Sequence, residues 1–286
     1  MQIYISTGLN KLITTSKLLK KFSQNNIKNV ELSSGIYEKD IFNKLKKIKK
    51  VNLLLHNYFP VPKKPFIINL ASKNKVIFNK SLNNLKKSIL YSSKLNLKYF
   101  SFHAGFLVDP NVKDFGRTLP RQIINKRNEI LNLFIKRINS VSKYAKKNNV
   151  MILLENNVLT KKNLKRFNKN PFLMTNFEES KKIMKNTDEN VRLLIDVAHL
   201  KVTSKTLNFN PAKYLSKLDD WIEAYHLSDN NGLADENKNI SPNSWFWKYL
   251  NKNAKYCTLE LKNLNIKNLK NQIGLCKSKL NLINKH

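Results

Sequence analysis

Short apolar runs recur along the chain, and longer amphipathic stretches separate them. Runs such as Leu53-Leu54-Leu55 and Ile152-Leu153-Leu154 are wholly apolar, which is typical of parallel strands that are buried on both faces. The pattern predicts eight strands, at residues 2–6, 29–33, 51–56, 97–103, 150–155, 193–196, 223–228 and 257–261.

The stretches between the strands have helical periodicity, with Lys on their outer positions. They predict helices at residues 37–50, 80–95, 121–147, 176–185, 211–218 and 244–250. Eight βα units in one chain favour a single α/β domain over residues 1–286, a (β/α)₈ TIM barrel. A doubly wound open sheet is the alternative, but Ser6-Thr7-Gly8-Leu9-Asn10 lacks the glycine spacing of a dinucleotide-binding turn.

Three connections are longer than an ordinary βα loop. They span residues 57–79, 104–120 and 229–243 and follow the third, fourth and seventh predicted strands. In a barrel these loops lie at the C-terminal mouth, where active sites are built. We therefore expect them to wall a pocket.

The chain carries 53 Lys and Arg against 19 Asp and Glu, a formal charge of +34. Such a charge would suit nucleic acid. Only six of these cations are Arg, however, and the lysines are spread along the chain among many Asn. Codon bias in an A/T-rich genome explains that composition better, so nucleic acid is the less favoured partner.

Composition excludes several other classes of protein. The 41% hydrophobic content excludes a disordered chain, and two Cys exclude a disulfide scaffold. No apolar run approaches the ~18 residues of a membrane span, and the first residues predict a strand instead of a signal peptide. We expect a cytoplasmic protein that does not enter a membrane.

The rarest reactive residues gather at the predicted strand ends. Four of the five His and four carboxylates lie there: His56, His103, His199, His226, Glu31, Glu155, Asp196 and Glu260. One such His is commonly structural, but a set of four that converges on one barrel mouth indicates a functional site. Carboxylate oxygen with imidazole nitrogen suits a divalent ion such as Mn, Co, Zn, Mg or Fe, and the absence of thiolates argues against structural zinc.

The strand ends resemble those of the xylose isomerase-like TIM barrel superfamily, which includes sugar-phosphate isomerases and epimerases and endonuclease IV. The motifs that carry the resemblance are Val30-Glu31-Leu32, Leu55-His56-Asn57, Phe102-His103-Ala104-Gly105, Leu154-Glu155-Asn156-Asn157, the Asp196 and His199 pair, His226-Leu227-Ser228-Asp229-Asn230 and Leu259-Glu260. The resemblance implies one divalent ion held by Glu155, Asp196, His226 and Glu260. It gives His56, His103 and His199 roles toward substrate or a second metal.

In the isomerase branch of this superfamily, the chemistry is proton transfer on a sugar that chelates the metal. Glu155 and Glu260 would act as the catalytic pair, one removing the proton beside the carbonyl and the other acting on the opposite face. The ion would stabilise the enediolate. A sugar or sugar-phosphate isomerase or epimerase is the favoured function.

The endonuclease branch needs more metal ligands. Asp235 and the four His match the ligands of that branch. Its Asp-x-His segment is incomplete, however, because Asn237 stands where the segment has its His. A metal-dependent abasic-site nuclease or phosphodiesterase is therefore the second hypothesis, followed by a sugar dehydratase or lyase. A barrel that keeps the metal without turnover is a non-enzymatic alternative, which the presence of both Glu155 and Glu260 disfavours.

The substrate leaves a weaker signal. Arg117, in the long loop after the fourth strand, is a candidate to pair with a phosphate or carboxylate, and Glu31 is a candidate to bind a hydroxyl. The sequence leaves open which sugar is bound, which metal is used and whether the chain forms homo-oligomers.

Overall fold

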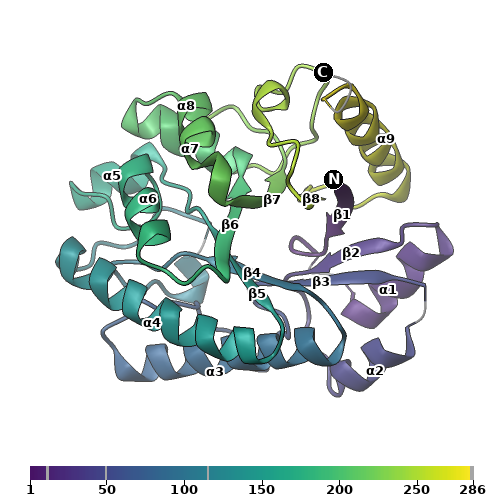
Figure 1. Cartoon of the computed structure of the whole chain (residues 1–286), viewed down its shortest axis with the longest axis horizontal. Helices are drawn as coiled ribbons and strands as arrows, with labels where there is room; N and C mark the ends of the chain where they lie inside the picture. The colour runs from purple at the N-terminus through teal and green to yellow at the C-terminus, as the bar shows by residue number, and fades with distance from the viewer. Residues whose placement is uncertain (11–12, 49, 115, 284–286) are drawn as a thin grey trace.

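The computed structural model describes residues 1–10, 13–48, 50–114 and 116–283. Eight parallel strands form a closed barrel in chain order, with β8 paired to β1 (Figure 1). The strands are β1 (Gln2–Ser6), β2 (Asn29–Leu32), β3 (Asn52–His56), β4 (Tyr99–His103), β5 (Met151–Glu155), β6 (Val191–Asp196), β7 (Ile222–Leu227) and β8 (Tyr256–Leu259). This confirms the predicted TIM barrel, and each observed strand end lies within two residues of its prediction.

Helices surround the barrel and cover the outer faces of the strands (Figure 1). They are α1 (Thr15–Gln24), α2 (Ile41–Lys47), α3 (Lys75–Lys94), α4 (Arg127–Lys147), α5 (Lys161–Phe167), α6 (Phe177–Lys185), α7 (Val197–Leu207), α8 (Pro211–Leu218) and α9 (Ile266–Ile283). Short 3₁₀ turns are η1 (Val112–Asp114), η2 (Asp219–Trp221) and η3 (Trp247–Tyr249). None of the helices in the described part of the chain is long and apolar enough to span a membrane.

The barrel interior is filled on the N-terminal side of the mouth. Side chains from seven of the strands form one buried cluster there, made of Tyr4, Leu54, Tyr99, Leu153, Leu194, Ala224 and Tyr256. Tyr4 and Tyr256 pack edge to face, with ring centroids 5.6 Å apart. Because this layer closes the barrel from below, polar side chains at the strand ends have to face the C-terminal mouth.

The predicted helix at residues 244–250 is wrong. Only the short turn η3 forms there, because side chains replace the backbone bonds of a helix. Ser244 Oγ donates to Asp229 Oδ2 over 2.7 Å, and Trp247 Nε1 donates to the Ser241 carbonyl over 2.8 Å. Such local bonds hold the backbone in turns.

Helix α7 was not predicted, although it matters to the mouth. Its Val and Thr residues have low intrinsic helix propensity. The helix starts directly after β6, and Asp196 Oδ1 caps it by accepting a 2.7 Å bond from the His199 amide. The cap therefore places the side chains of Asp196 and His199 next to each other.

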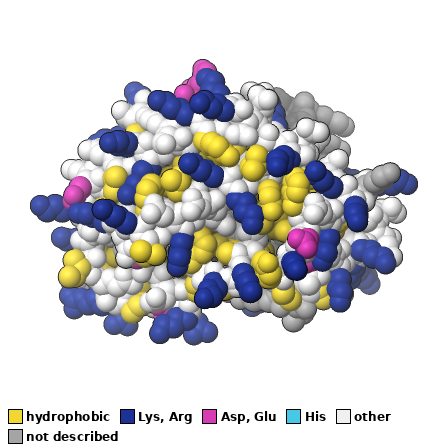
Figure 2. Space-filling view, turned by 90° about the horizontal axis from the view of Figure 1, so that it is seen from below, with side chains coloured by type: hydrophobic (Ala, Val, Ile, Leu, Met, Phe, Trp, Pro, Cys, Tyr) yellow, Lys and Arg dark blue, Asp and Glu magenta, His cyan; other side chains and the backbone are white. Residues whose placement is uncertain are grey.

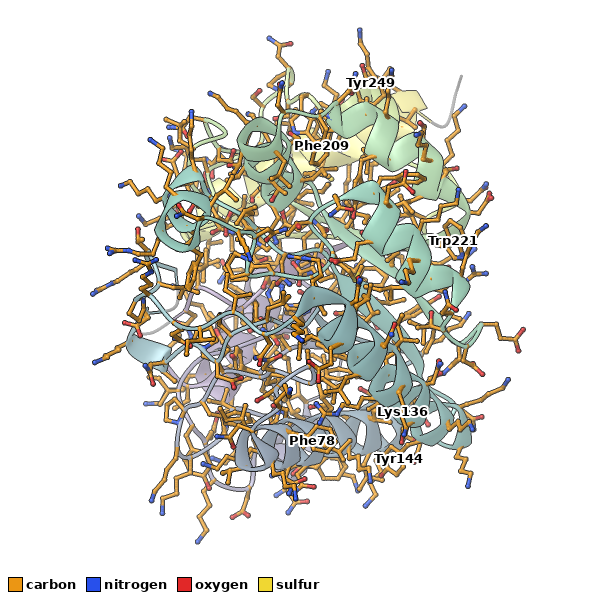
Figure 3. All side chains as sticks on the ribbon, turned by 90° about the vertical axis from the view of Figure 1, so that its left-hand side faces the viewer. Phe78, Lys136, Tyr144, Phe209, Trp221 and Tyr249 are labelled. Carbon is orange, nitrogen blue, oxygen red and sulfur yellow. The ribbon has the colours of Figure 1, made fainter. Side chains whose placement is uncertain are left out.

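The outer helices carry cations over aromatic rings. The Arg137 guanidinium of α4 lies 3.7 Å from the Phe78 ring centroid of α3, and Lys86 Nζ of α3 lies 5.5 Å from the Tyr144 ring centroid of α4. Figure 3 labels Phe78 and Tyr144 on these two helices. On the face shown in Figure 2, Lys and Arg are scattered among hydrophobic side chains without forming a stripe. This distribution agrees with a charge that reflects composition more than one dedicated surface.

A buried amide joins the long loop after β3 to the loop after β4. Asn69 Nδ2 donates to the carbonyl oxygens of Phe106 and Val108 and to Asp109 Oδ1, at 3.2, 3.0 and 2.8 Å. Its Oδ1 accepts from the amides of Ala71 and Phe106. Both loops are therefore fixed as walls of the mouth by one side chain.

We predict that Asn69→Asp destabilises the fold by about 3 kcal/mol, because an oxygen replaces the amide donor and faces two carbonyls and a carboxylate. Asn74→Asp is the matched control: Asn74 only caps α3 as an acceptor, and Asp caps as well as Asn. Denaturant unfolding followed by circular dichroism measures both variants. Equal unfolding midpoints for the two would contradict this role of Asn69.

Candidate active site

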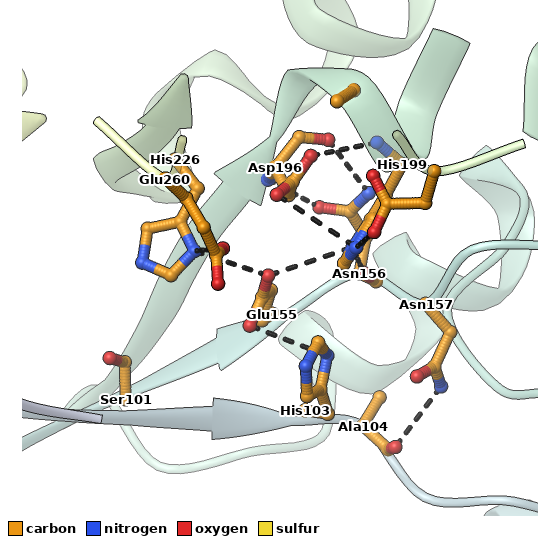
Figure 4. A network of polar contacts seen from close by, with 12 residues as sticks. Ser101, His103, Ala104, Glu155, Asn156, Asn157, Asp196, His199, His226 and Glu260 are labelled. Atoms are coloured by element: carbon orange, nitrogen blue, oxygen red, sulfur yellow. Dashed lines mark hydrogen bonds and ion pairs between the residues drawn. The ribbon is translucent and has the colours of Figure 1, made fainter. Parts of the chain in front are cut away.

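The predicted site residues meet at the C-terminal ends of the strands (Figure 4). His56, His103, Glu155 and Asp196 are the last residues of β3, β4, β5 and β6. The strand register aligns His103 with Glu155 and Asp196 with His226. Glu260 directly follows β8, where its amide still bonds to the carbonyl of Leu227. In-register parallel pairing thus brings residues more than two hundred positions apart to one point.

Glu155 lies at the centre of the cluster and is wholly buried. Its Oε2 is 3.3 Å from His56 Nε2 and 3.3 Å from His103 Nδ1. Its Oε1 is 3.3 Å from His226 Nδ1 and 3.6 Å from His199 Nδ1. Burial opposes ionisation of this carboxyl, but the facing imidazoles hold its pKa well below the usual range.

Four side chains form a group that could hold a metal ion. Glu155, Asp196, His226 and Glu260 each offer one ligand atom, and these atoms lie within 4.8 Å of one another. Both oxygens of Glu155, Asp196 Oδ2 and His226 Nδ1 are buried without a hydrogen-bond partner among the described residues. Buried polar atoms normally have partners. Two carboxylates and an imidazole with unpartnered atoms, beside the carboxylate of Glu260, fit a divalent cation.

The carboxyl groups of this group differ in their ionisation. Burial, with the Asp235 and Glu155 charges nearby, raises the pKa of Asp196 to about 7. Burial acts the same way on Glu260, but hydrogen bonding and charge from His226 lower the pKa of Glu260 below its usual value. Burial also lowers the pKa of His103 to about 4, so this imidazole is neutral at pH 7.

Second partners fix the imidazoles in place. His56 Nδ1 lies 2.9 Å from Ser101 Oγ, which leaves Nε2 to face Glu155. His199 Nδ1 lies 3.0 Å from the Asn156 carbonyl, and its Nε2 lies 3.2 Å from Asp235 Oδ2. Asp235 therefore joins the cluster from the β7 loop.

Glu31 is the penultimate residue of β2 and is wholly buried. Its Oε1 and Oε2 are 3.0 and 3.2 Å from His226 Nε2, and Thr258 Oγ1 donates to Oε2 over 3.1 Å. Arg117 is exposed on the loop after β4 and makes no hydrogen bond or ion pair with the described residues of the cluster. The fifth His, His286, lies outside the described residues.

Asn237 serves the backbone at the edge of the site. Its Nδ2 donates to the Glu260 carbonyl over 3.3 Å, and its own carbonyl accepts from the Lys262 amide over 2.8 Å. The side chain therefore holds the segment after β8 against the β7 loop. An amide at this position does not supply the further imidazole that the nuclease pattern has there.

Sequence analysis missed several residues that support the site. Asn156 links the ends of β5 and β6, because its Nδ2 donates to the Asp196 carbonyl and its Oδ1 accepts from the Asp196 amide. Gly8 leaves room for Glu260: a Cβ at this position would lie 2.8 Å from Glu260 Oε1. The adjacent Asn156 in Leu154-Glu155-Asn156 was a visible signal, whereas nothing in the sequence marks the contact between Gly8 and Glu260.

Comparisons with known proteins agree with the barrel. A D-tagatose 3-epimerase-like protein superposes with a TM-score of 0.76 at 20% identity, covering 100% of this chain and 99% of that one. The D-psicose 3-epimerase of Clostridium cellulolyticum, solved with D-tagatose, gives 0.66 at 13% identity, covering 99% and 98%. A Thermus thermophilus protein from a crystal soaked with ZnCl₂ gives 0.66 at 18% identity, covering 97% and 99%.

At these identities the likeness to solved structures shows the fold alone. No curated protein matches the sequence. A family model described as the xylose isomerase-like TIM barrel matches residues 23–265, which include every residue of the four-ligand group. The chain therefore belongs to the xylose isomerase-like TIM barrel family.

Proposed function

We propose that the protein is a divalent-metal-dependent isomerase or epimerase that acts on a sugar or sugar phosphate. The observation that carries the proposal is the group of Glu155, Asp196, His226 and Glu260, whose ligand atoms lie within 4.8 Å of one another at the barrel mouth. The ketose 3-epimerases among the structural neighbours support a ketose as the substrate class.

Exposure indicates where a substrate meets this group. The side chains of His103, Glu260 and Asp235 are 18, 16 and 25% exposed, whereas that of Glu155 is 0% exposed. The first three therefore form the rim that a sugar contacts first. Glu155 lies deeper, and a sugar reaches it only after filling the pocket.

Proton transfer follows from this placement. Glu260 faces the opening and takes the proton from the carbon beside the carbonyl, which makes Glu260 the neutral acid. Glu155, three strands away around the barrel, returns a proton to the opposite face after it has received one from a facing imidazole. His103 is neutral, so it can donate to or accept from a sugar hydroxyl without adding charge. A bound divalent ion would supply Lewis-acid stabilisation of the negative charge beside the carbonyl.

Phosphodiester hydrolysis is the second candidate function, and one observation favours it. His56, His103 and Glu155 form a further group whose ligand atoms lie within 4.8 Å of one another. His199 and Asp235, which contact each other, add two more potential ligands. Multi-metal phosphodiesterases need such additional ligands. Asn237 counts against a complete set, because its side chain bonds to the backbone of Glu260.

We predict that Mn²⁺, Co²⁺, Zn²⁺ or Mg²⁺ raises the melting temperature of the purified protein. An ion at a hundred times its dissociation constant adds about 2.7 kcal/mol of stability. Asp196→Asn should abolish most of this increase, because Asn still caps α7 but loses the ligand charge. Asp220→Asn, on the surface before β7, should keep it. An equal increase in both variants would place the ion elsewhere.

We predict that a panel of ketoses and ketose phosphates contains a substrate that is epimerised or isomerised in the presence of the metal. In D₂O the product should carry deuterium at the reacting carbon. Glu155→Gln and Glu260→Gln should each lower kcat at least 100-fold, the usual effect of losing an acid–base group. The control is Glu223→Gln, since Glu223 bonds to Tyr99 at the opposite end of the barrel. Full activity in both site variants would refute the assignment.

We predict no incision of a labelled duplex that contains an abasic-site analogue, with either Zn²⁺ or Mn²⁺ supplied. The reason is that Asn237 leaves the multi-metal ligand set incomplete. Gel electrophoresis of the products measures this directly. Metal-dependent incision that disappears in His103→Gln, at a salt concentration that suppresses non-specific binding, would favour the second candidate instead.

A further inference from the structure

The buried carboxylate of Glu31 has no place in the proton transfer described above. It is wholly buried, and its described partners are two side chains, His226 and Thr258. A buried carboxylate is costly unless it is paired. The pairing of Glu31 with His226 therefore indicates where its role lies.

His226 is held from both sides of its ring. Nδ1 faces the four-ligand group, 3.1 Å from Glu260 Oε2 and 3.3 Å from Glu155 Oε1. Nε2 faces the opposite way, 3.0 and 3.2 Å from the two oxygens of Glu31. When a divalent ion occupies the Nδ1 side, the carboxylate of Glu31 holds the remaining ring proton on Nε2, and the lone pair of Nδ1 is directed at the ion.

Glu31 is itself held in place. Thr258 Oγ1, on β8, donates to Oε2 over 3.1 Å, and β8 also leads directly into Glu260. Strands β2, β7 and β8 therefore contribute to one chain of contacts from Thr258 through Glu31 to His226. This chain involves neither the pocket opening nor the loops.

We propose that Glu31 is a positioning residue that fixes the tautomer and ring orientation of His226 so that Nδ1 binds the divalent ion. The inference rests on the metal centre of the proposed function, and it goes beyond that function by assigning a residue that touches neither ion nor substrate. Carboxylates that hold the second nitrogen of a ligating His typically change metal affinity 10- to 100-fold when they are replaced.

Two substitutions separate the parts of this role. Glu31→Gln keeps an oxygen that accepts from His226 Nε2 but removes the charge, whereas Glu31→Met removes every acceptor at similar volume. We expect the dissociation constant for Zn²⁺, measured by competition with a chromophoric chelator, to rise about 10-fold in Glu31→Gln and about 100-fold in Glu31→Met. Thr258→Val, which frees Glu31 to turn, should give a rise of less than 10-fold.

Glu223→Gln is the matched control, because Glu223 is a half-buried carboxylate of β7 that accepts from Tyr99 at the other end of the barrel. It should leave the dissociation constant unchanged. In the Zn²⁺-loaded wild type, ¹⁵N-histidine NMR should show that Nε2 of His226 carries a proton and that its Nδ1, which binds the ion, carries none. The same pattern should persist in Glu31→Gln.

The graded loss, with the control at the wild-type value, supports the assignment. A wild-type dissociation constant in Glu31→Gln and Thr258→Val overturns it. An Nε2 of His226 without a proton in the loaded protein also overturns it. Equal losses in Glu31→Gln and Glu31→Met also overturn it, since charge alone would then matter. If Glu31→Met fails to fold, the other two variants still decide the question. These measurements use no sugar, so a failed epimerisation assay does not affect them. A wild-type protein that does not bind Zn²⁺ would refute the proposed function itself.

Discussion

The mouth of the barrel is organised around the buried carboxylate of Glu155, which faces four imidazoles. Each of its oxygens lies within 3.6 Å of two His nitrogens. A lone carboxylate at this depth would be neutralised by protonation, because burial disfavours the charged form. Here the imidazoles hold it ionised. His56, His103, His199 and His226 together surround this one charge.

The barrel meets that need through strand register. A closed parallel barrel brings the C-terminal ends of its strands to one mouth, and its register pairs His103 with Glu155 and Asp196 with His226. Ligands that are far apart in sequence thereby become neighbours. The layer of Tyr4, Tyr99, Tyr256 and aliphatic residues below them keeps water from the inner side of the cluster. The polar contacts of the site therefore act in a medium that screens them weakly. Rigid strands, more than flexible loops, set the distances in the site.

Much of this arrangement could be predicted from the sequence, because its signals are local. Apolar runs locate the strands, and a His or carboxylate at the end of a run identifies a mouth residue. The contact between Gly8 and Glu260 could not be predicted, since it depends on which neighbouring strand lies against Gly8. Asn156 was visible beside Glu155, but its two bonds to the backbone of Asp196 depend on the pairing of β5 with β6. Helix α7 was missed because its residues have weak helix propensity. In the structure the cap by Asp196 outweighs that weak propensity. Residues 244–250 were predicted as helix from the spacing of their aromatic side chains. The sequence does not show that Ser244 bonds to Asp229 and competes with the helix.

The contrast between the surface and the mouth affects how ligands reach the site. Five of the 19 acids, Glu31, Glu155, Asp196, Asp235 and Glu260, gather in a protein whose formal charge is +34. An approaching molecule comes within a Debye length, about 8 Å at physiological ionic strength, of the cations on the exterior before it comes that close to the acids of the mouth. It therefore experiences a positive potential first. Added salt should therefore speed the entry of a divalent cation and slow the entry of an anionic sugar. Ionic strength thus acts in opposite directions on metal loading and on capture of a phosphorylated substrate.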